Sequence, residues 1–314
     1  MAEDLTRMIV VPIDGSENSL ISLEYLHTLY GADNNVEVKL FYVLPQLPLI
    51  LQEEQTKSRE VAQKIKAIEN KNLRRAEKIL AKARDMLVSK GFAEDRIEAI
   101  YQDRRVGVAR DTCHWADNKR ADAVAITTRG LSKIEAFFMG EISSKLIEFC
   151  KIAPVWTVRG PVESNKVLIG IDNSENSMRA VDHAGFMLSG TDAEVILFHT
   201  LRRLSRFMPP EVLAAAPDIE EIWERSAEQE ISSYLEKAKV MLLDAGFSEN
   251  QVTTKVVKGT DSPAFDILQE AQASECGTIV LGQRGYSGAM DFLFGSITKK
   301  VIENSAGKAI WFVQ

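Results

Sequence analysis

Cysteine is scarce in this chain, and it has neither long hydrophobic runs nor an excess of basic charge. Only three cysteines occur in 314 residues, and Cys113, Cys150 and Cys276 lie far apart without CxxC spacing. An odd, widely spaced set predicts no disulfide framework and favours a reducing compartment. No run approaches the ~18 apolar residues of a membrane span, and no export signal is recognised at the N-terminus. We therefore expect a cytoplasmic protein.

Charge and histidine content argue against two further classes of function. The formal net charge is −7, whereas nucleic-acid binding normally requires a basic face. The four histidines, His27, His114, His183 and His199, show no HxH or HExxH spacing. We predict no metal held by protein ligands, and we interpret each histidine as a surface residue or a hydrogen-bonded core residue.

What the sequence does contain is an internal repeat. The segment MIVVPIDGSENS at 8–19 recurs as VLIGIDNSENS at 167–177. Further along, KGF at 90–92 returns as AGF at 245–247, and PVWTV at 154–158 returns as KAIWFV at 308–313. The length also exceeds the ~150 residues that one domain usually takes. The sequence therefore predicts two homologous domains, 1–160 and 161–314.

Each half alternates short apolar runs with helical patterns. In the first half the runs are 8–13, 36–43, 97–101, 123–127 and 155–158, and continuous apolar runs are typical of parallel strands buried on both faces. Apolar residues at three- and four-residue steps between Val61 and Leu87, followed by Lys90 and Gly91, predict an amphipathic crossover helix. Such units wind into an open α/β sheet, whose ligands bind at the carboxyl ends of the strands.

The most specific pattern follows the apolar run at 278–281. Residues 282–296 read GQRGYSGAMDFLFGS. Gly282 and Gly285 allow a loop to turn tightly and to approach an anion through its amides. Gly295 and Ser296 would present amides and a hydroxyl where the next helix begins. This arrangement predicts a phosphate-binding loop.

With these residues the chain resembles a tandem universal stress protein, and the resemblance covers nearly all of it. The nucleotide-binding signature of that family is G-x2-G-x9-G-[ST], and 282–296 satisfies every position. The resemblance implies two open, five-stranded parallel-sheet α/β sandwich domains, Rossmann-like and of the adenine nucleotide alpha hydrolase-like type. It also implies ATP as ligand, with Mg²⁺ carried on the triphosphate. Domains of the family pair through their last strands, here within one chain, and a homodimer is a further option.

The resemblance also implies a set of ligand-binding residues. Asp172 matches a position beside ribose and adenine, Gly170 and Ile171 lie near the base, and the backbone of Thr200 matches an adenine contact. The phosphate-side residues are Gly282, Gln283, Arg284, Gly285, Gly288, Gly295, Ser296, Ile297 and Thr298. Taken by themselves, the residues leave alternatives open, because Asp172 also suits a turn or helix cap and Arg284 a solvated or interface position.

The first half departs from the signature at two of its four positions. Thr127 replaces the first glycine, and Glu141 replaces the serine. A carboxylate at a helix N-terminus would take the place of a phosphate and repel one. We therefore predict no ATP in the first domain, although Asp14, Arg129 and Lys133 leave another anionic ligand open.

Two other features each have two interpretations. The apolar segments 44–51 and 201–213 would form a lid or a partner-binding edge, or else fold back on their own domains. Arg202, Arg203 and Arg206 would place positive charge near the second-half site. Trp156 and Trp311 would pack between the two domains, or else be simple core aromatics.

The sequence favours a binding module over an enzyme. The glycine loop lacks the lysine of a GxxxxGK[ST] motif, and no nucleophile–base pair can be assigned, so no catalytic residue is predicted. We expect a cytoplasmic stress-response protein whose conformation or choice of protein partner follows ATP occupancy. One alternative is a slow ATPase or phosphotransferase that uses Asp172 and Ser296. Another is a structural pairing protein that binds no nucleotide.

Overall fold

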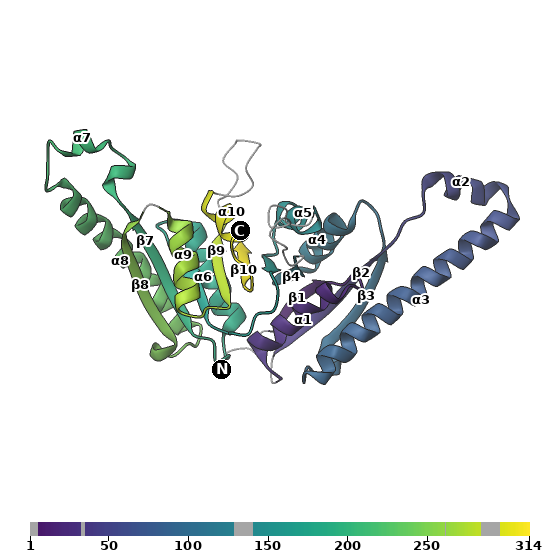
Figure 1. Ribbon diagram of the computed structural model, residues 1–314. Helices are drawn as coiled ribbons and strands as arrows, with labels where there is room; N and C mark the ends of the chain where they lie inside the picture. The colour runs from purple at the N-terminus through teal and green to yellow at the C-terminus, as the bar shows by residue number, and fades with distance from the viewer. Residues whose placement is uncertain (1–5, 33–34, 129–140, 261, 284–295) are drawn as a thin grey trace. The chain divides into compact units, whose positions relative to one another are not determined.

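The computed structural model describes residues 6–32, 35–128, 141–260, 262–283 and 296–314 (Figure 1). These residues form two compact units. The first comprises the described residues up to Thr128 and those at 141–155, and the second comprises those from Trp156 onward. Strands and helices alternate in both units, which confirms the predicted α/β fold class.

The first unit is a parallel sheet with strand order β3-β2-β1-β4. Its elements are β1 (Arg7–Pro12), α1 (Glu17–Tyr30), β2 (Val36–Leu44), α2 (Leu49–Lys57), α3 (Arg59–Ser89), η1 (Glu94–Arg96), β3 (Ile97–Asp103), α4 (Val108–Lys119), β4 (Ala123–Thr127) and α5 (Glu141–Phe149). β5 (Val155–Val158) begins at the last residue of this unit.

The second unit repeats the architecture with order β10-β9-β6-β7-β8, again parallel. Its elements are β6 (Val167–Gly170), α6 (Glu175–Leu188), β7 (Val195–Arg202), η3 (Leu204–Arg206), α7 (Pro210–Leu213), α8 (Ile219–Asp244), η4 (Glu249–Gln251), β8 (Val252–Thr260), α9 (Pro263–Ala273), β9 (Thr278–Gly282), α10 (Ser296–Glu303) and β10 (Ala309–Val313).

The predicted crossover helix is α3. Its buried residues are Ile65, Ala76, Leu80, Ala83 and Leu87, which recur at helical spacing. The chain leaves the helix through Gly91, whose φ of +94° lies in the left-handed region that a side chain rarely adopts. Sequence periodicity and the helix stop therefore both predicted this element correctly.

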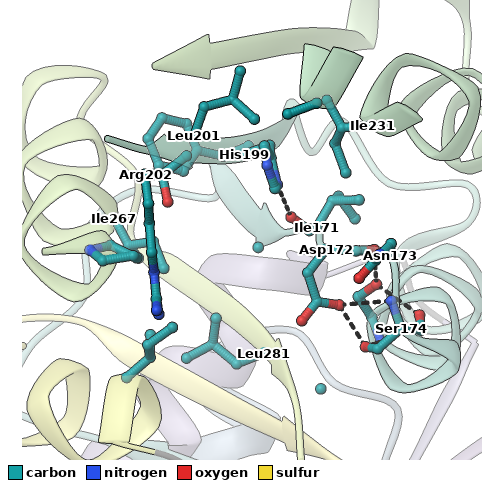
Figure 2. A pocket seen from close by; sticks show the side chains of 18 of the residues that line it. Ile171, Asp172, Asn173, Ser174, His199, Leu201, Arg202, Ile231, Ile267 and Leu281 are labelled. Atoms are coloured by element: carbon teal, nitrogen blue, oxygen red, sulfur yellow. Dashed lines mark hydrogen bonds between the residues drawn. The ribbon is translucent and has the colours of Figure 1, made fainter. Parts of the chain in front are cut away.

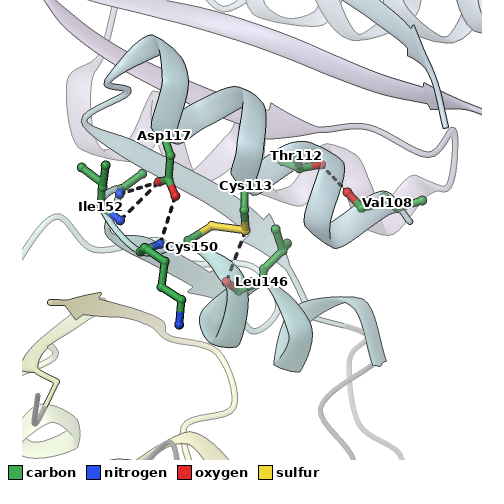
Figure 3. The surroundings of a disulfide bond; sticks show 9 residues. Val108, Thr112, Cys113, Asp117, Leu146, Cys150 and Ile152 are labelled. Atoms are coloured by element: carbon green, nitrogen blue, oxygen red, sulfur yellow. Dashed lines mark hydrogen bonds between the residues drawn. A yellow bond between two sulfur atoms is a disulfide. The ribbon is translucent and has the colours of Figure 1, made fainter. Parts of the chain in front are cut away.

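The prediction that the cysteines form no disulfide is wrong for one pair. Cys113 on α4 and Cys150, directly after α5, form a disulfide, with their Cα atoms 4.8 Å apart (Figure 3). Both cysteines are buried. Cys276 is also buried, but its thiol is free. The chain between the two cysteines folds so that α4 and α5 pack together, and sequence spacing alone does not reveal that contact.

Trp156 and Trp311 both belong to the second unit and are both fully buried. Their rings stack with centroids 3.8 Å apart. The indole Nε1 of Trp156 donates to Nε2 of His183 on α6 at 3.1 Å. Within this unit the two buried tryptophans and the half-buried His183 of α6 thus form one cluster.

Candidate functional site

A cavity of about 660 Å³ lies in the second unit, at the carboxyl ends of β6, β7 and β9. In an open α/β sheet this edge is where ligands bind, and the volume is within the usual range of small-molecule sites. Seven of the residues predicted to bind the ligand line the cavity: Gly170, Ile171, Asp172, Thr200, Gly282, Ile297 and Thr298. The structure therefore brings together residues that are up to 128 positions apart in sequence.

The Asp172 carboxylate is held in a turn at the start of α6 (Figure 2). Its Oδ1 accepts hydrogen bonds from the backbone N–H of Ser174, at 3.0 Å, and from the Ser174 hydroxyl. Ser174 in turn caps α6 by accepting from the N–H of Ser177 at 3.2 Å. Asp172 has the turn role, and it also faces the cavity, so the two interpretations of this residue are compatible.

Gly170 and Gly282 are positions where neighbouring atoms approach closely. A Cβ on Gly282 would lie 2.4 Å from the carbonyl oxygen of Asn176 and 2.9 Å from the N–H nitrogen of Ser177. A Cβ on Gly170 would lie 2.8 Å from a methyl carbon of Leu281. Glycine at 282 thus allows the end of β9 to pack directly on the first turn of α6. This packing is a reason for glycine that the sequence pattern did not suggest.

The rest of the predicted phosphate side is only partly described. The helix expected after the glycine loop is α10, and it begins at Ser296. The backbone N–H of Gln283 donates to the carbonyl of Val313 at 2.6 Å. Arg284, Gly285, Gly288 and Gly295, and the side chain of Ser296, lie outside the described residues.

Comparison with known proteins assigns the chain to a family. A profile of the universal stress protein family matches residues 6–159 and again 163–307. The chain belongs to the universal stress protein family. The universal stress protein YxiE of Bacillus subtilis is 29% identical over 144 residues, which are 45% of this chain and 93% of that protein.

Solved structures show the same architecture. The universal stress protein of Archaeoglobus fulgidus superposes with a TM-score of 0.62 at 18% identity and covers 99% of this chain and 97% of its own. A solved universal stress protein in complex with cAMP covers 48% of this chain and 95% of its own, at 21% identity and a TM-score of 0.35. The two successive family matches, at 6–159 and 163–307, confirm the resemblance to a tandem member of the family.

His199, Phe207 and Trp223 are among the cavity residues that were not singled out as ligand contacts from the sequence. His199 on β7 lines the cavity, and its Nδ1 lies 2.7 Å from the carbonyl oxygen of Ile171. Phe207 and Trp223 also line it, with ring centroids 5.5 Å apart. Neither aromatic residue belongs to a motif. His199 immediately precedes the predicted contact Thr200, and this adjacency was the one available sequence signal.

The two apolar segments after β2 and β7 both contribute to cavities. In the second unit Leu201, Arg202 and Phe207 line the cavity at the ends of β6, β7 and β9, and the Arg202 carbonyl accepts a hydrogen bond from Trp223 Nε1 at 3.2 Å. In the first unit the segment from Leu44 to Leu47 lines a separate cavity of about 720 Å³ beside α2 and α3. Of the three arginines predicted near the second-unit site, Arg202 is the one that lines its cavity.

The first unit repeats the aspartate turn but not the glycine contact. Asp14 Oδ1 accepts from the N–H of Ser16 at 2.8 Å, as Asp172 does from Ser174. Thr127 stands where the second unit has Gly282, and its hydroxyl shares a 2.6 Å hydrogen bond with the hydroxyl of Ser22. The first unit therefore accommodates the Thr127 side chain at the position where the second unit has a glycine. The side chain of Glu141, and residues 129–140, lie outside the described residues.

The described residues contain neither a cluster of metal ligands nor a membrane-spanning helix. No group of three or more His, Cys, Asp or Glu residues in that part of the chain is arranged to hold a metal ion. No helix among the same residues is long and apolar enough to cross a membrane.

Proposed function

We propose that the second domain, residues 161–314, binds ATP with Mg²⁺ in the cavity at the ends of β6, β7 and β9. The observation that carries the proposal is the position of this cavity. It lies where β9 leads into the glycine motif at 282–296, and that motif leads into α10. Amides at the start of a helix favour phosphate oxygens, and Thr298 adds a hydroxyl on the same side. Asp172 supplies a carboxylate suited to accept hydrogen bonds from ribose hydroxyls.

We further propose that the first domain, residues 1–160, binds no ATP. Two local differences support this. Thr127 occupies the Gly282 position and is engaged with Ser22, and Glu141 is the first residue of α5, where a carboxylate would repel a phosphate. The protein would then act as a cytoplasmic stress-response module that has one nucleotide site per chain. Nucleotide occupancy would set its conformation or its choice of protein partner.

Calorimetric titration of the nucleotide-stripped full chain with Mg-ATP tests the proposal. We expect one site per chain, lost in Ser296→Glu because the new carboxylate repels phosphate. Asp172→Ala should weaken ATP binding about 10- to 100-fold, because hydrogen bonds to charged groups contribute roughly 1.5–3 kcal/mol.

Asp14→Ala is the matched control, because it removes the same turn hydrogen bonds in the first unit; it should leave ATP affinity unchanged. Two sites in the wild type would overturn the proposal that the first domain binds no ATP. The absence of any site would overturn the proposal of nucleotide binding altogether. Steady ADP release that Asp172→Ala abolishes, with ATP still bound, would establish an ATPase instead of a binding module.

A further inference from the structure

His199 has a fixed tautomer in the cavity. Its Nδ1 lies 2.7 Å from the carbonyl oxygen of Ile171, and this contact is drawn in Figure 2. A carbonyl oxygen only accepts hydrogen bonds, so Nδ1 carries the proton and donates. In the neutral ring, Nε2 then has a free lone pair and is an acceptor. The backbone carbonyl of Ile171, directly after β6, thereby determines which nitrogen of His199 is able to accept.

The surroundings keep the ring neutral. Burial lowers the pKa of His199 below its ordinary value and outweighs the opposing effect of the nearby Asp172 charge. The apolar side chains of Leu201 and Ile231 line the same cavity as the ring and are labelled with it in Figure 2. Among the described residues the structure gives Nε2 no hydrogen-bond partner. Nε2 is not among the fully buried unpaired polar atoms of the described residues, and His199 lines the cavity, so a ligand or water there is able to donate to it.

The position of His199 indicates which part of a nucleotide it would contact. The phosphate side of the cavity is at Gly282, Ile297 and Thr298, whereas His199 lies on β7 next to Thr200 and close to Ile171. The aromatic pair Phe207 and Trp223 lines the same cavity and offers planar apolar surface. An acceptor in apolar surroundings suits a nucleoside better than a polyphosphate, because phosphate oxygens are themselves acceptors.

We propose that Nε2 of His199 accepts a hydrogen bond from the nucleoside part of the ligand and so selects ligands that carry a donor there. This inference rests on the proposed nucleotide function. Two groups of ATP have the required chemistry, namely the exocyclic amino group of the base and a ribose hydroxyl. The first unit differs at this point. The backbone N–H groups of Ile13 and Ile171 bond to the carbonyls of Phe41 and Phe198, respectively, so Tyr42 is the counterpart of His199.

Two substitutions separate the structural role of His199 from its ligand role. In His199→Asn the side-chain amide still reaches Ile171 with an N–H donor, but the acceptor at the Nε2 position is lost. In His199→Gln an amide head group extends to the Nε2 position and supplies an acceptor there. Calorimetry with ATP, ITP and 2′-deoxy-ATP measures the outcome. ITP replaces the amino group with an oxygen, and 2′-deoxy-ATP lacks one ribose hydroxyl.

We expect the wild type to bind one of the two analogues about 10-fold more weakly than ATP, because one net hydrogen bond inside the cavity is lost. His199→Asn should bind ATP about 10-fold more weakly and lose the discrimination, and His199→Gln should keep most of both. Weak binding of ITP that disappears in His199→Asn would identify the base amino group as the donor. Weak binding of 2′-deoxy-ATP that disappears in the same variant would identify the ribose 2′-hydroxyl, because discrimination due to Asp172 alone would remain. Equal wild-type affinities for all three nucleotides, or an unchanged His199→Asn variant, would overturn the inference and leave the proposed function standing.

A spectroscopic readout makes the test independent of folding effects. ¹⁵N NMR of the imidazole side chains should show His199 with protonated Nδ1 and bare Nε2 in the free protein. The Nε2 resonance should shift when Mg-ATP is added, because a new hydrogen bond to the lone pair changes its shielding. ATP binding without any Nε2 shift would refute the role of His199. A wild type that binds none of the three nucleotides would refute the proposed function as well.

Discussion

At the scale of single residues, burial fixes the chemistry of the two histidines in the second unit. His199 donates to a backbone carbonyl and faces the cavity. His183 instead accepts the indole N–H of Trp156 and packs edge-on against Trp311. Burial lowers the pKa of His183 to about 3, because a charged ring would lose its hydration without gaining a counter-ion. His183 is therefore a neutral part of the core.

The pKa of His183 predicts a loss of stability in mild acid. The unfolded state takes up a proton near the ordinary pKa of 6.5, whereas the folded state does so only at about 3. The contribution of neutral His183 to the free energy of unfolding is thus complete above pH 6.5 and is lost as the pH falls toward 3. Between pH 7 and pH 5 the free energy of unfolding should fall by about 2 kcal/mol on this account.

Urea denaturation of wild type and His183→Gln at several pH values measures this contribution. Glutamine does not titrate, and its carbonyl oxygen is able to accept the Trp156 indole N–H, so the variant should show the shallower pH dependence. The same substitution at the exposed His114 serves as control and should leave the slope unchanged. If the free energy of unfolding depended on pH equally in wild type and His183→Gln, the attribution of this pH dependence to His183 would be contradicted.

At the scale of secondary-structure elements, the two units hold equivalent helices together by different means. In the first unit the Cys113–Cys150 disulfide joins α4 to the end of α5. The Asp117 carboxylate also accepts from the backbone N–H groups at 151–153, at 3.0–3.3 Å. In the second unit Lys308 donates from Nζ to the carbonyls of Ala271 and Cys276 at the end of α9. A covalent link is thus specific to the first unit.

Reduction of that link should destabilise the first unit. The cysteines are 37 residues apart in sequence, and closing a loop of that size contributes about 3–4 kcal/mol by restricting the unfolded chain. Thermal denaturation with and without a phosphine reductant should show a lower transition temperature in the reduced protein. Cys113→Ala should melt near the reduced wild type and should not respond to reductant. Cys276→Ala is the control and should respond as the wild type does.

At the scale of the whole molecule, the two units differ in what would stabilise them. The disulfide belongs to the first unit, and the cavity with the glycine motif to the second. Duplication has therefore left two copies of one α/β architecture with different local chemistry. Thr127 against Gly282 and Tyr42 against His199 are two such differences at equivalent positions. ATP and reductant should accordingly act on different units.

Hydrogen exchange followed by mass spectrometry should separate these effects in the full chain. At 100 times its dissociation constant a ligand stabilises the folded state by about 2.7 kcal/mol, so the slowest amides of the second unit should exchange about 100-fold more slowly with Mg-ATP. Amides of α4 and α5 should respond to reductant instead. Equal protection of both units by ATP would mean that the first domain also binds nucleotide or that the units unfold together.

Local sequence patterns were sufficient to predict the repeat, the order of strands and helices along the chain, and part of the cavity edge. These follow from local patterns: apolar runs predict buried parallel strands, and a residue that ends such a strand lies at the carboxyl edge wherever the sheet forms. For this reason Asp172 and Gly282 could be placed at this edge without a structure, whereas Thr200 was predicted from the family resemblance. The helix that begins at Ser296 was predicted on the same basis.

The contacts between segments that are distant in sequence depend on the tertiary fold. The Cys113–Cys150 bond, the Trp156–His183 hydrogen bond and the stacking of Trp156 on Trp311 each join residues that no spacing rule connects. The Nδ1 proton of His199 likewise depends on the Ile171 carbonyl, 28 residues earlier. Such contacts are set by the packing of helices on the sheet, where orientation and burial act together. A sequence pattern indicates whether a segment forms a helix or a strand, but it does not indicate which distant segment that element will contact.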